Sequence, residues 1–171
     1  AYSIHPIFAF PDKYNSYKTL QNACFSIEGP ENHMHEIKDF FHSLGNKSFV
    51  INSDNKPLYH LASVTVSNLV LSLIHTGCSY LSKCGLSEND ALEALLPLIK
   101  NNIDNVKENG FLNALTGPVD RNDLGTIKMH MSALPIEDVA LYKNLSLKLL
   151  SLSEKKHKSK DFKKLKEYLE T

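Results

Sequence analysis

The spacing of apolar residues changes once along this chain, near Asp54, and this change constrains the fold more than any other feature. Before it, alternating runs over residues 23–27 and 47–52 predict strands, and an apolar stripe at a 3.6-residue period predicts a helix over 31–44. After it, nearly all apolar residues recur at helical spacing. We therefore predict a mainly α chain. Residues 1–52 would form an incomplete α/β layer with three strands, and residues 53–171 an all-helical domain.

Five helices are expected after the change, over about 57–84, 87–108, 123–134, 135–152 and 154–171. Gly85 ends the first of them, because glycine readily adopts the conformation that follows a helix. Ser87 with Asp90 forms a capping box for the second, and Pro97 should kink it.

The first of these helices is apolar nearly all round, which predicts burial on most sides. One polar stripe interrupts it, formed by His60, Ser63, Ser67, Asn68 and His75. Buried polar side chains need partners or a wet cleft. Bonding to neighbouring helices is the simpler interpretation for Ser63 and His75, whereas His60 and Asn68 together favour a cleft.

Composition limits the possible partners and the compartment. The 171 residues carry no formal net charge, so no global field favours nucleic acid or an acidic membrane. Residues 154–171 hold seven lysines against four acids, which is typical of a solvated helix face. The three cysteines form no metal spacing and predict reduced thiols in a cytoplasmic protein. No signal peptide and no apolar run long enough to span a bilayer is evident in the sequence, and no metal site is expected.

Arg121 is the only arginine beside eighteen lysines. A guanidinium differs from an ammonium by its planar fork, which grips a carboxylate or phosphate through two parallel hydrogen bonds. Gly117-Pro118 before it, and Asn122-Asp123 after it, predict a tight turn that leads into a helix N-terminus, where an anion could be held. A single surface arginine left by lysine-biased usage is the alternative.

Polar residues on two later helices could join the same site. His130 lies three residues after Ile127 and four before Leu134, so we expect it to face inward. Asp123 lies two turns earlier on that side, and Asn105 on the preceding helix could face the same cleft. A core histidine and a surface asparagine are the plainer interpretations.

Several well-known motifs are absent from the sequence, including the glycine-rich dinucleotide fingerprint, the P-loop, the nucleophile elbow and the zincin spacing. Ala1 is not methionine, and the apparent strand at Tyr2-Ser3-Ile4 begins almost at once. We therefore expect that an N-terminal portion precedes these residues in the intact protein.

A series of short motifs resembles a known family: Ser3-Ile4-His5-Pro6, Phe10, Ile27-Glu28-Gly29, Tyr59-His60-x-Ala62, Ser67-Asn68, Leu96-Pro97-Leu98, Asn105, Gly110, and Ala-Leu-Thr-Gly-Pro-Val-x-Arg-x-Asp with His130. They are similar to the C-terminal two thirds of a Rossmann-type oxidoreductase family with a helical second domain. The resemblance spans about residues 2–151, and its Thr-Gly-Pro-x-x-Arg-x-Asp block is specific. The family usually has Arg-Gly-Asp where this chain has Arg121-Asn122-Asp123.

The resemblance implies an architecture and a cofactor. Residues 1–52 would be the last strands and helix of a Rossmann-type nucleotide-binding domain whose glycine fingerprint lies outside this chain. Residues 53–171 would be a substrate and dimerisation domain similar to the helical domain of 6-phosphogluconate dehydrogenase. The intact protein would be an NADPH-dependent reductase of a small 2-oxo acid, with ketopantoate reduction in pantothenate synthesis as the best candidate. This chain alone would be inactive.

The resemblance also implies roles for individual residues. His60 would be the proton donor or oxyanion stabiliser, and Asn68 would orient the reacting carbonyl. His5 and Pro6 would border the nicotinamide. The residues expected to bind the substrate are Arg121 as the carboxylate clamp, Asn105, Thr116, Asp123 and His130.

Two other functions remain open. The substrate could be another small acid or imine, as in pyrroline-5-carboxylate reductases. From a different class, the chain could be a non-catalytic helical interaction module, because helical domains of this superfamily often carry a homodimer interface. Convergence of Arg121, His60 and Asn68 on one cleft would favour an enzyme.

Overall fold

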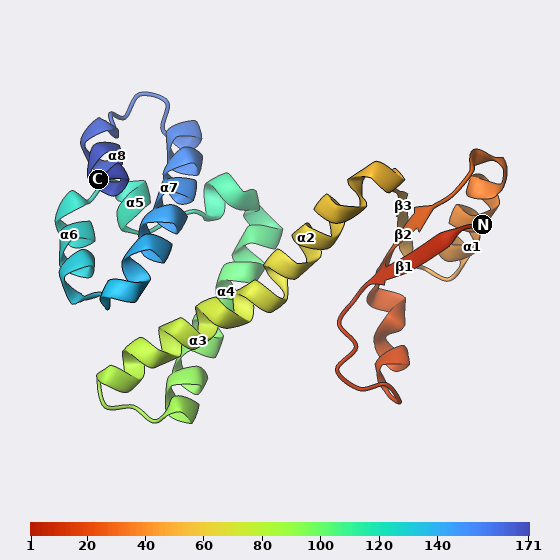
Figure 1. Ribbon diagram of the computed structural model, residues 1–171, viewed down its shortest axis with the longest axis horizontal. Helices are drawn as coiled ribbons and strands as arrows, with labels where there is room; N and C mark the ends of the chain where they lie inside the picture. The colour runs from red at the N-terminus through yellow and green to blue at the C-terminus, as the bar shows by residue number, and fades with distance from the viewer. The chain divides into compact units, whose positions relative to one another are not determined.

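The computed structural model describes residues 1–171 and begins with a small sheet (Figure 1). Its strands are β1 (Ser3–Ile7), β2 (Cys24–Glu28) and β3 (Lys47–Val50), in the order β1-β2-β3. β1 is antiparallel to β2, and β2 is parallel to β3. Helix α1 (Met34–Ser43) connects the two parallel strands, as such a crossover requires. The three predicted strands and the helix between them are confirmed, and no strand follows residue 50.

A small aromatic core lies between the sheet and α1. Phe25 of β2 stacks on Phe41 of α1 with ring centroids 4.3 Å apart, and Ala23 and Ile27 are buried beside them. The side-chain amide of buried Asn46 donates to the carbonyl oxygens of Leu20 and Ala23, which fixes the segment before β2. That segment contains a 3-10 helix, Ser16–Asn22, that the sequence pattern did not predict.

The predicted helix over 57–84 is two helices, α2 (Lys56–Val66) and α3 (Asn68–Lys83), divided at Ser67. Ser67 has φ −110° and ψ −75°, outside the usual helical values. Its hydroxyl donates to the Ser63 carbonyl oxygen at 2.7 Å, and Thr65 makes the same kind of bond to Leu61. Such bonds compete with the backbone ladder and bend helices, which accounts for the division.

The prediction that the helix over residues 57–84 is buried on most sides is wrong. Its exposed apolar side chains are Leu58, Leu61, Val66, Leu69, Val70, Leu71 and Leu73, with Val66 at 73% exposure. By length and composition, the stretch Ser53–Lys83 with mean hydropathy 1.4 could also cross a membrane. This corrects the expectation that no apolar run is long enough.

The remaining helices are α4 (Glu88–Ala114), α5 (Pro118–Arg121), α6 (Leu124–Ala133), α7 (Val139–Lys156) and α8 (Lys163–Glu170), with 3-10 turns at Ser53–Asn55 and Ile136–Asp138. The Ser87–Asp90 capping box forms as predicted: the Ser87 hydroxyl donates to the Asp90 carboxylate at 2.6 Å and accepts from its backbone N–H. α4 runs through Pro97 and is interrupted at Gly110, where φ is 71°. The helix predicted to end near residue 108 is therefore only broken there, at Gly110, and continues for one more turn to Ala114.

The C-terminal helices share their own apolar core. Its buried members are Val119, Ile127, Leu150, Phe162, Leu165 and Leu169. The last three come from the lysine-rich tail, whose lysines 163, 164 and 166 are exposed on the opposite side of α8. The predicted solvated face is present, but the tail also completes the core.

The chain divides into two compact units, Ala1–Leu92 and Glu93–Thr171. The change from strands to helices follows β3, as predicted, yet α2 and α3 group with the sheet. The division at residue 52 therefore marks a change of secondary structure, and as a functional domain boundary it stays a prediction.

Candidate functional site

A cavity of about 300 Å³ opens in the first unit, between the sheet and the start of α2. It is lined by Ser3, His5, Ser26, Glu28, Ile51, Lys56, Tyr59 and His60. The strands contribute residues on one face, because positions two apart on a strand point the same way. One carboxylate, one ammonium, two imidazoles and one phenol therefore meet around a small space.

Tyr59 is the best fixed of these groups. Its hydroxyl lies 3.0 Å from Nδ1 of His5, and the two rings meet edge to face at 87°. Phe49 of β3 contacts the same tyrosine ring with centroids 6.3 Å apart. The Ser26 hydroxyl donates to the His5 carbonyl oxygen at 3.2 Å and so holds the backbone of β1 at this point. Strands β1 and β3, which flank β2, thus both hold Tyr59 of α2 in position.

A charged pair lies on the same cavity. Lys56 Nζ is 2.9 Å from a carboxylate oxygen of Glu28, and the lysine side chain is 55% exposed. An ion pair with that exposure adds little stability, so an anionic ligand could replace the glutamate at small cost.

His60 lines this cavity, and Asn68 lines a neighbouring one of about 710 Å³. His5 contributes to both cavities, and Pro6 contributes to the second. The structure thus brings His5, Pro6, His60 and Asn68 to adjoining spaces between β1 and the two helices. Ser63 also lines the second cavity, with its hydroxyl bonded to the carbonyl oxygen of Tyr59. This bond lies within α2, so it is not the bond to a neighbouring helix that the plainer interpretation of Ser63 predicts.

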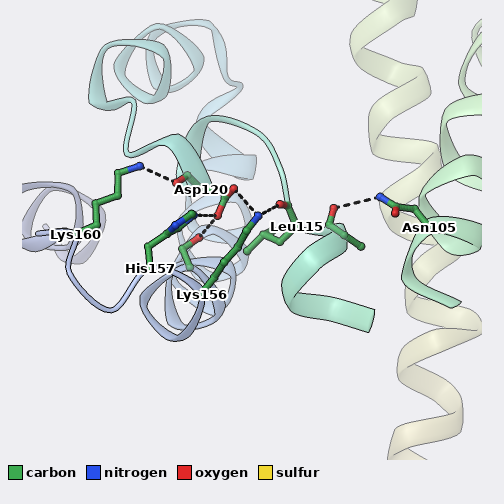
Figure 2. A network of polar contacts seen from close by, with 8 residues as sticks. Asn105, Leu115, Asp120, Lys156, His157 and Lys160 are labelled. Atoms are coloured by element: carbon green, nitrogen blue, oxygen red, sulfur yellow. Dashed lines mark hydrogen bonds and ion pairs between the residues drawn. The ribbon is translucent and has the colours of Figure 1, made fainter. Parts of the chain in front are cut away.

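In the second unit, a network of polar groups surrounds Asp120 of α5 (Figure 2). Its carboxylate accepts from Lys156 Nζ at 3.0 Å and lies 2.9 Å from Nε2 of His157. Lys160 donates to the Asp120 carbonyl oxygen, and Lys156 also donates to that of Leu115. Burial acts to raise the pKa of Asp120, but the hydrogen bonds and positive charges of Lys156 and His157 outweigh it and lower the pKa.

This network holds the turn that carries Arg121. Arg121 ends α5 and its side chain is 63% exposed, with Nη2 3.8 Å from the Asp123 carboxylate. Asn122 follows in the left-handed conformation, with φ 59° and ψ 38°. Asparagine tolerates that conformation better than most residues, so it can stand where the resembling family has glycine. The tight turn predicted here is confirmed.

α6 begins next to Asp123, where the sequence predicts a helix N-terminus, and Asp123 caps the helix. Its side chain accepts from the backbone N–H of Thr126 at 3.0 Å and from the Thr126 hydroxyl at 2.7 Å. The backbone hydrogen bond from Thr126 is the main cause that lowers the pKa of Asp123, so this end of the helix already holds a negative charge.

The other predicted substrate residues are spread over the second unit. His130 is exposed and its Nδ1 lies 2.8 Å from the Tyr142 hydroxyl, so the expected inward orientation is wrong. Burial raises the pKa of Tyr142, which keeps this phenol protonated. Thr116 is exposed, and Asn105 is half-buried with its amide 3.4 Å from the Ala114 carbonyl oxygen.

The predicted site residues therefore form two groups, one in each compact unit. The roles assigned to both groups stay predictions, as does their convergence on one substrate. Sequence reasoning missed Tyr59, Lys56 and Glu28 in the first unit and Asp120 with His157 in the second. Tyr59 and Glu28 lie inside the quoted motifs, and Asp120 is the unassigned position before Arg121.

Residues 23–149 match the family of the domain of unknown function DUF2520, which is about three quarters of the sequence. The chain belongs to this family. No curated protein matches the DUF2520 chain.

Two solved structures resemble the DUF2520 chain. Protein TM1727 from Thermotoga maritima is 29% identical, with a TM-score of 0.78 over 91% of this chain and 62% of that one. Protein BF3122 from Bacteroides fragilis, described as a "putative NADP oxidoreductase", is 27% identical, with a TM-score of 0.59 over 77% of this chain and 50% of that one. The chain thus spans less than two thirds of either relative.

Proposed function

We propose that the intact protein is an NADPH-dependent reductase of a small 2-oxo acid, with ketopantoate as the first substrate to test. The observation that carries the proposal is the cavity that joins His5 of β1 to His60 of α2, in a chain similar to a described NADP oxidoreductase. Reduction of a 2-oxo acid needs a hydride, a proton for the new hydroxyl and a cationic clamp for the carboxylate.

In this proposal NADPH supplies the hydride, and the chain supplies the other groups. His5 and Pro6 would border the nicotinamide at the end of β1. His60 would donate the proton or stabilise the oxyanion, and Asn68 would orient the carbonyl. The proposed substrate contacts are Arg121 as the carboxylate clamp, Asn105, Thr116, Asp123 and His130.

The exposure of Arg121 supports its role as a clamp. Its ion pair with Asp123 is long, at 3.8 Å, and leaves most of the guanidinium accessible to an external carboxylate. The Asp120 network holds the backbone beneath it, which would reduce the ordering that binding requires.

A spectrophotometric assay tests the substrate. The intact protein should oxidise NADPH when ketopantoate is added, faster than with pyrroline-5-carboxylate at equal concentration. A preference for the cyclic imine would move the assignment to the other reductase class. Failure to oxidise NADPH or NADH with any small 2-oxo acid or imine would reject the enzymatic proposal.

The 171-residue chain provides a separate test. It holds no glycine-rich turn at a helix N-terminus to receive a pyrophosphate, so it should bind NADPH weakly or not at all. Calorimetry measures this directly, and tight binding by the chain alone would show that the cofactor site is misplaced.

We propose that the protein is cytoplasmic, as its odd number of cysteines suggests, and that the apolar surface of α2 and α3 forms a homodimer interface. Val66 and Leu71 are 73% and 64% exposed, and soluble proteins rarely leave so many large apolar side chains uncovered. We favour a second copy over a membrane because His60, Asn68 and His75 interrupt the apolar surface, and because α2 and α3 divide at Ser67.

A non-catalytic interaction module is the second candidate, and the same surface favours it. Light scattering of the intact protein and of Leu71→Lys should give a dimer and a monomer, respectively. A monomeric wild type that sediments with lipid vesicles would favour a membrane instead. A dimer without reductase activity would favour the module.

A further inference from the structure

Tyr59 occupies a position that neither the motifs nor the comparisons assign to any role. Tyr59 lines the 300 Å³ cavity beside His60, and its hydroxyl contacts Nδ1 of His5 at 3.0 Å. Its ring is half-buried and is contacted from two strands, by His5 on β1 and Phe49 on β3. The phenol is therefore held in one place by tertiary contacts before any ligand arrives.

His60 differs in this respect. It lines the same cavity, but its side chain is exposed and no protein group hydrogen-bonds to its ring. A proton donor works best when its distance to the accepting atom is fixed, whereas an oxyanion can be stabilised by a positive charge in a less fixed position. The geometry thus separates proton donation from oxyanion stabilisation, the two roles that were left open for His60.

We propose that Tyr59 is the catalytic proton donor of the reductase, that His5 returns the proton to it, and that His60 stabilises the oxyanion. This inference rests on the proposed reductase function and names the acid within it. The ligand class of the cavity is then a small carbonyl compound whose oxygen lies within hydrogen-bond distance of the Tyr59 hydroxyl.

The proton and electron balance is simple. NADPH, bound beside His5 and Pro6, would supply the hydride that the carbonyl carbon accepts as the π bond of the carbonyl group breaks, so the cofactor would be oxidised and the substrate reduced. The alkoxide oxygen takes the proton of the Tyr59 hydroxyl as the new O–H bond forms. The Tyr59 phenolate takes a proton from Nδ1 of protonated His5, and solvent reprotonates His5, which is exposed.

The charges around the phenol fit this sequence of transfers. The groups that face it are His5 from β1, Glu28 from β2, and Lys56 and His60 from α2. Glu28 and Lys56 neutralise each other at 2.9 Å, so the two imidazoles remain as the groups that can stabilise a transient phenolate.

The test uses the intact protein with the substitution Tyr59→Phe, which keeps the ring contacts and removes only the hydroxyl. We expect kcat to fall about a hundredfold, as for loss of a general acid, with an unchanged melting temperature. Tyr14→Phe is the matched control, because Tyr14 is 72% exposed and lies outside the cavity, and its kcat should not change.

Histidine substitutions assign the pH dependence. The pH profile of kcat should lose its dependence on the histidine in His5→Gln, whereas His60→Gln should lower kcat and keep the shape of the profile. Loss of the pH dependence in His60→Gln alone would make His60 the acid and overturn the inference. In the 171-residue chain without cofactor, Tyr59→Phe should shift the ¹⁵N resonances of His5, and Tyr14→Phe should not.

The outcomes separate the two levels of the proposal. An active wild type with an equally active Tyr59→Phe would overturn the role of Tyr59 and leave the reductase assignment intact. A wild type that reduces no carbonyl substrate would overturn both.

Discussion

Replacement of Asp120 with asparagine should lower the stability of the second unit more than any other isosteric change in its polar groups. The carboxylate is 11% exposed and accepts charge-assisted hydrogen bonds from Lys156 and His157 at 3.0 and 2.9 Å. The Ser153 hydroxyl lies 3.5 Å from the same group. Asparagine keeps the shape but removes the charge. Its NH2 group is a donor and would face the N–H groups of Lys156 or His157 in place of an accepting oxygen.

The size of the effect follows from these contacts. Hydrogen bonds to charged groups contribute about 1.5–3 kcal/mol each, and loss of the carboxylate charge leaves the half-buried ammonium of Lys156 without its counter-charge. Lys156 keeps 23% of its side chain exposed, which lets water offset part of the loss. We therefore expect a decrease of about 2–3 kcal/mol in the free energy of unfolding, or roughly 10–20 °C in melting temperature for a unit of this size.

Urea unfolding of the 171-residue chain, followed by circular dichroism, measures the change. Glu154→Gln is the matched control, because Glu154 is an exposed acid on the same helix, α7. The pKa of Asp120 is lowered in the folded state, so its contribution is complete above the unfolded value and is lost as pH falls through the folded one. Wild type should thus lose stability below about pH 4, and Asp120→Asn should lose less. An Asp120→Asn chain as stable as Glu154→Gln would refute this account of the network.

Three further substitutions test other parts of the structure. Arg121→Lys in the intact enzyme should reduce kcat/KM about ten- to hundredfold with a normal melting temperature, because lysine lacks the fork; normal kinetics with an earlier melt would make Arg121 structural. Asn122→Val should be less stable than Asn122→Gly by about 1–2 kcal/mol in urea unfolding, because a β-branched residue resists φ 59°, whereas both variants lose the hydrogen bond from the Asn122 amide to the Asp161 carbonyl oxygen. Gly29→Ala would place a Cβ 2.3 Å from the Tyr2 ring, so it should lower the melting temperature, and Tyr2→Ala in the same chain should restore part of the loss.

The elements that are set by residues close together in the sequence could be predicted from it. The three strands, the Ser87–Asp90 capping box and the start of α6 near Asp123 all follow from patterns within a few residues. The left-handed residue after Arg121 also agrees with a turn predicted from Gly117-Pro118 and Asn122-Asp123. The division at Ser67 was missed because serine hydroxyls that bond within their own helix leave the apolar period unchanged.

The groups that carry the proposed chemistry were decided by the tertiary structure. The sequence alone determined where strands give way to helices, which residues form the capping box of α4, and that Arg121 lies in a constrained turn. It could not show that Tyr59 meets His5 fifty-four residues away, or that Asp120 meets Lys156 and His157 across thirty-six and thirty-seven residues. Local propensity depends on residues within one or two helical turns. These contacts join residues on separate elements, so they form only when those elements pack together.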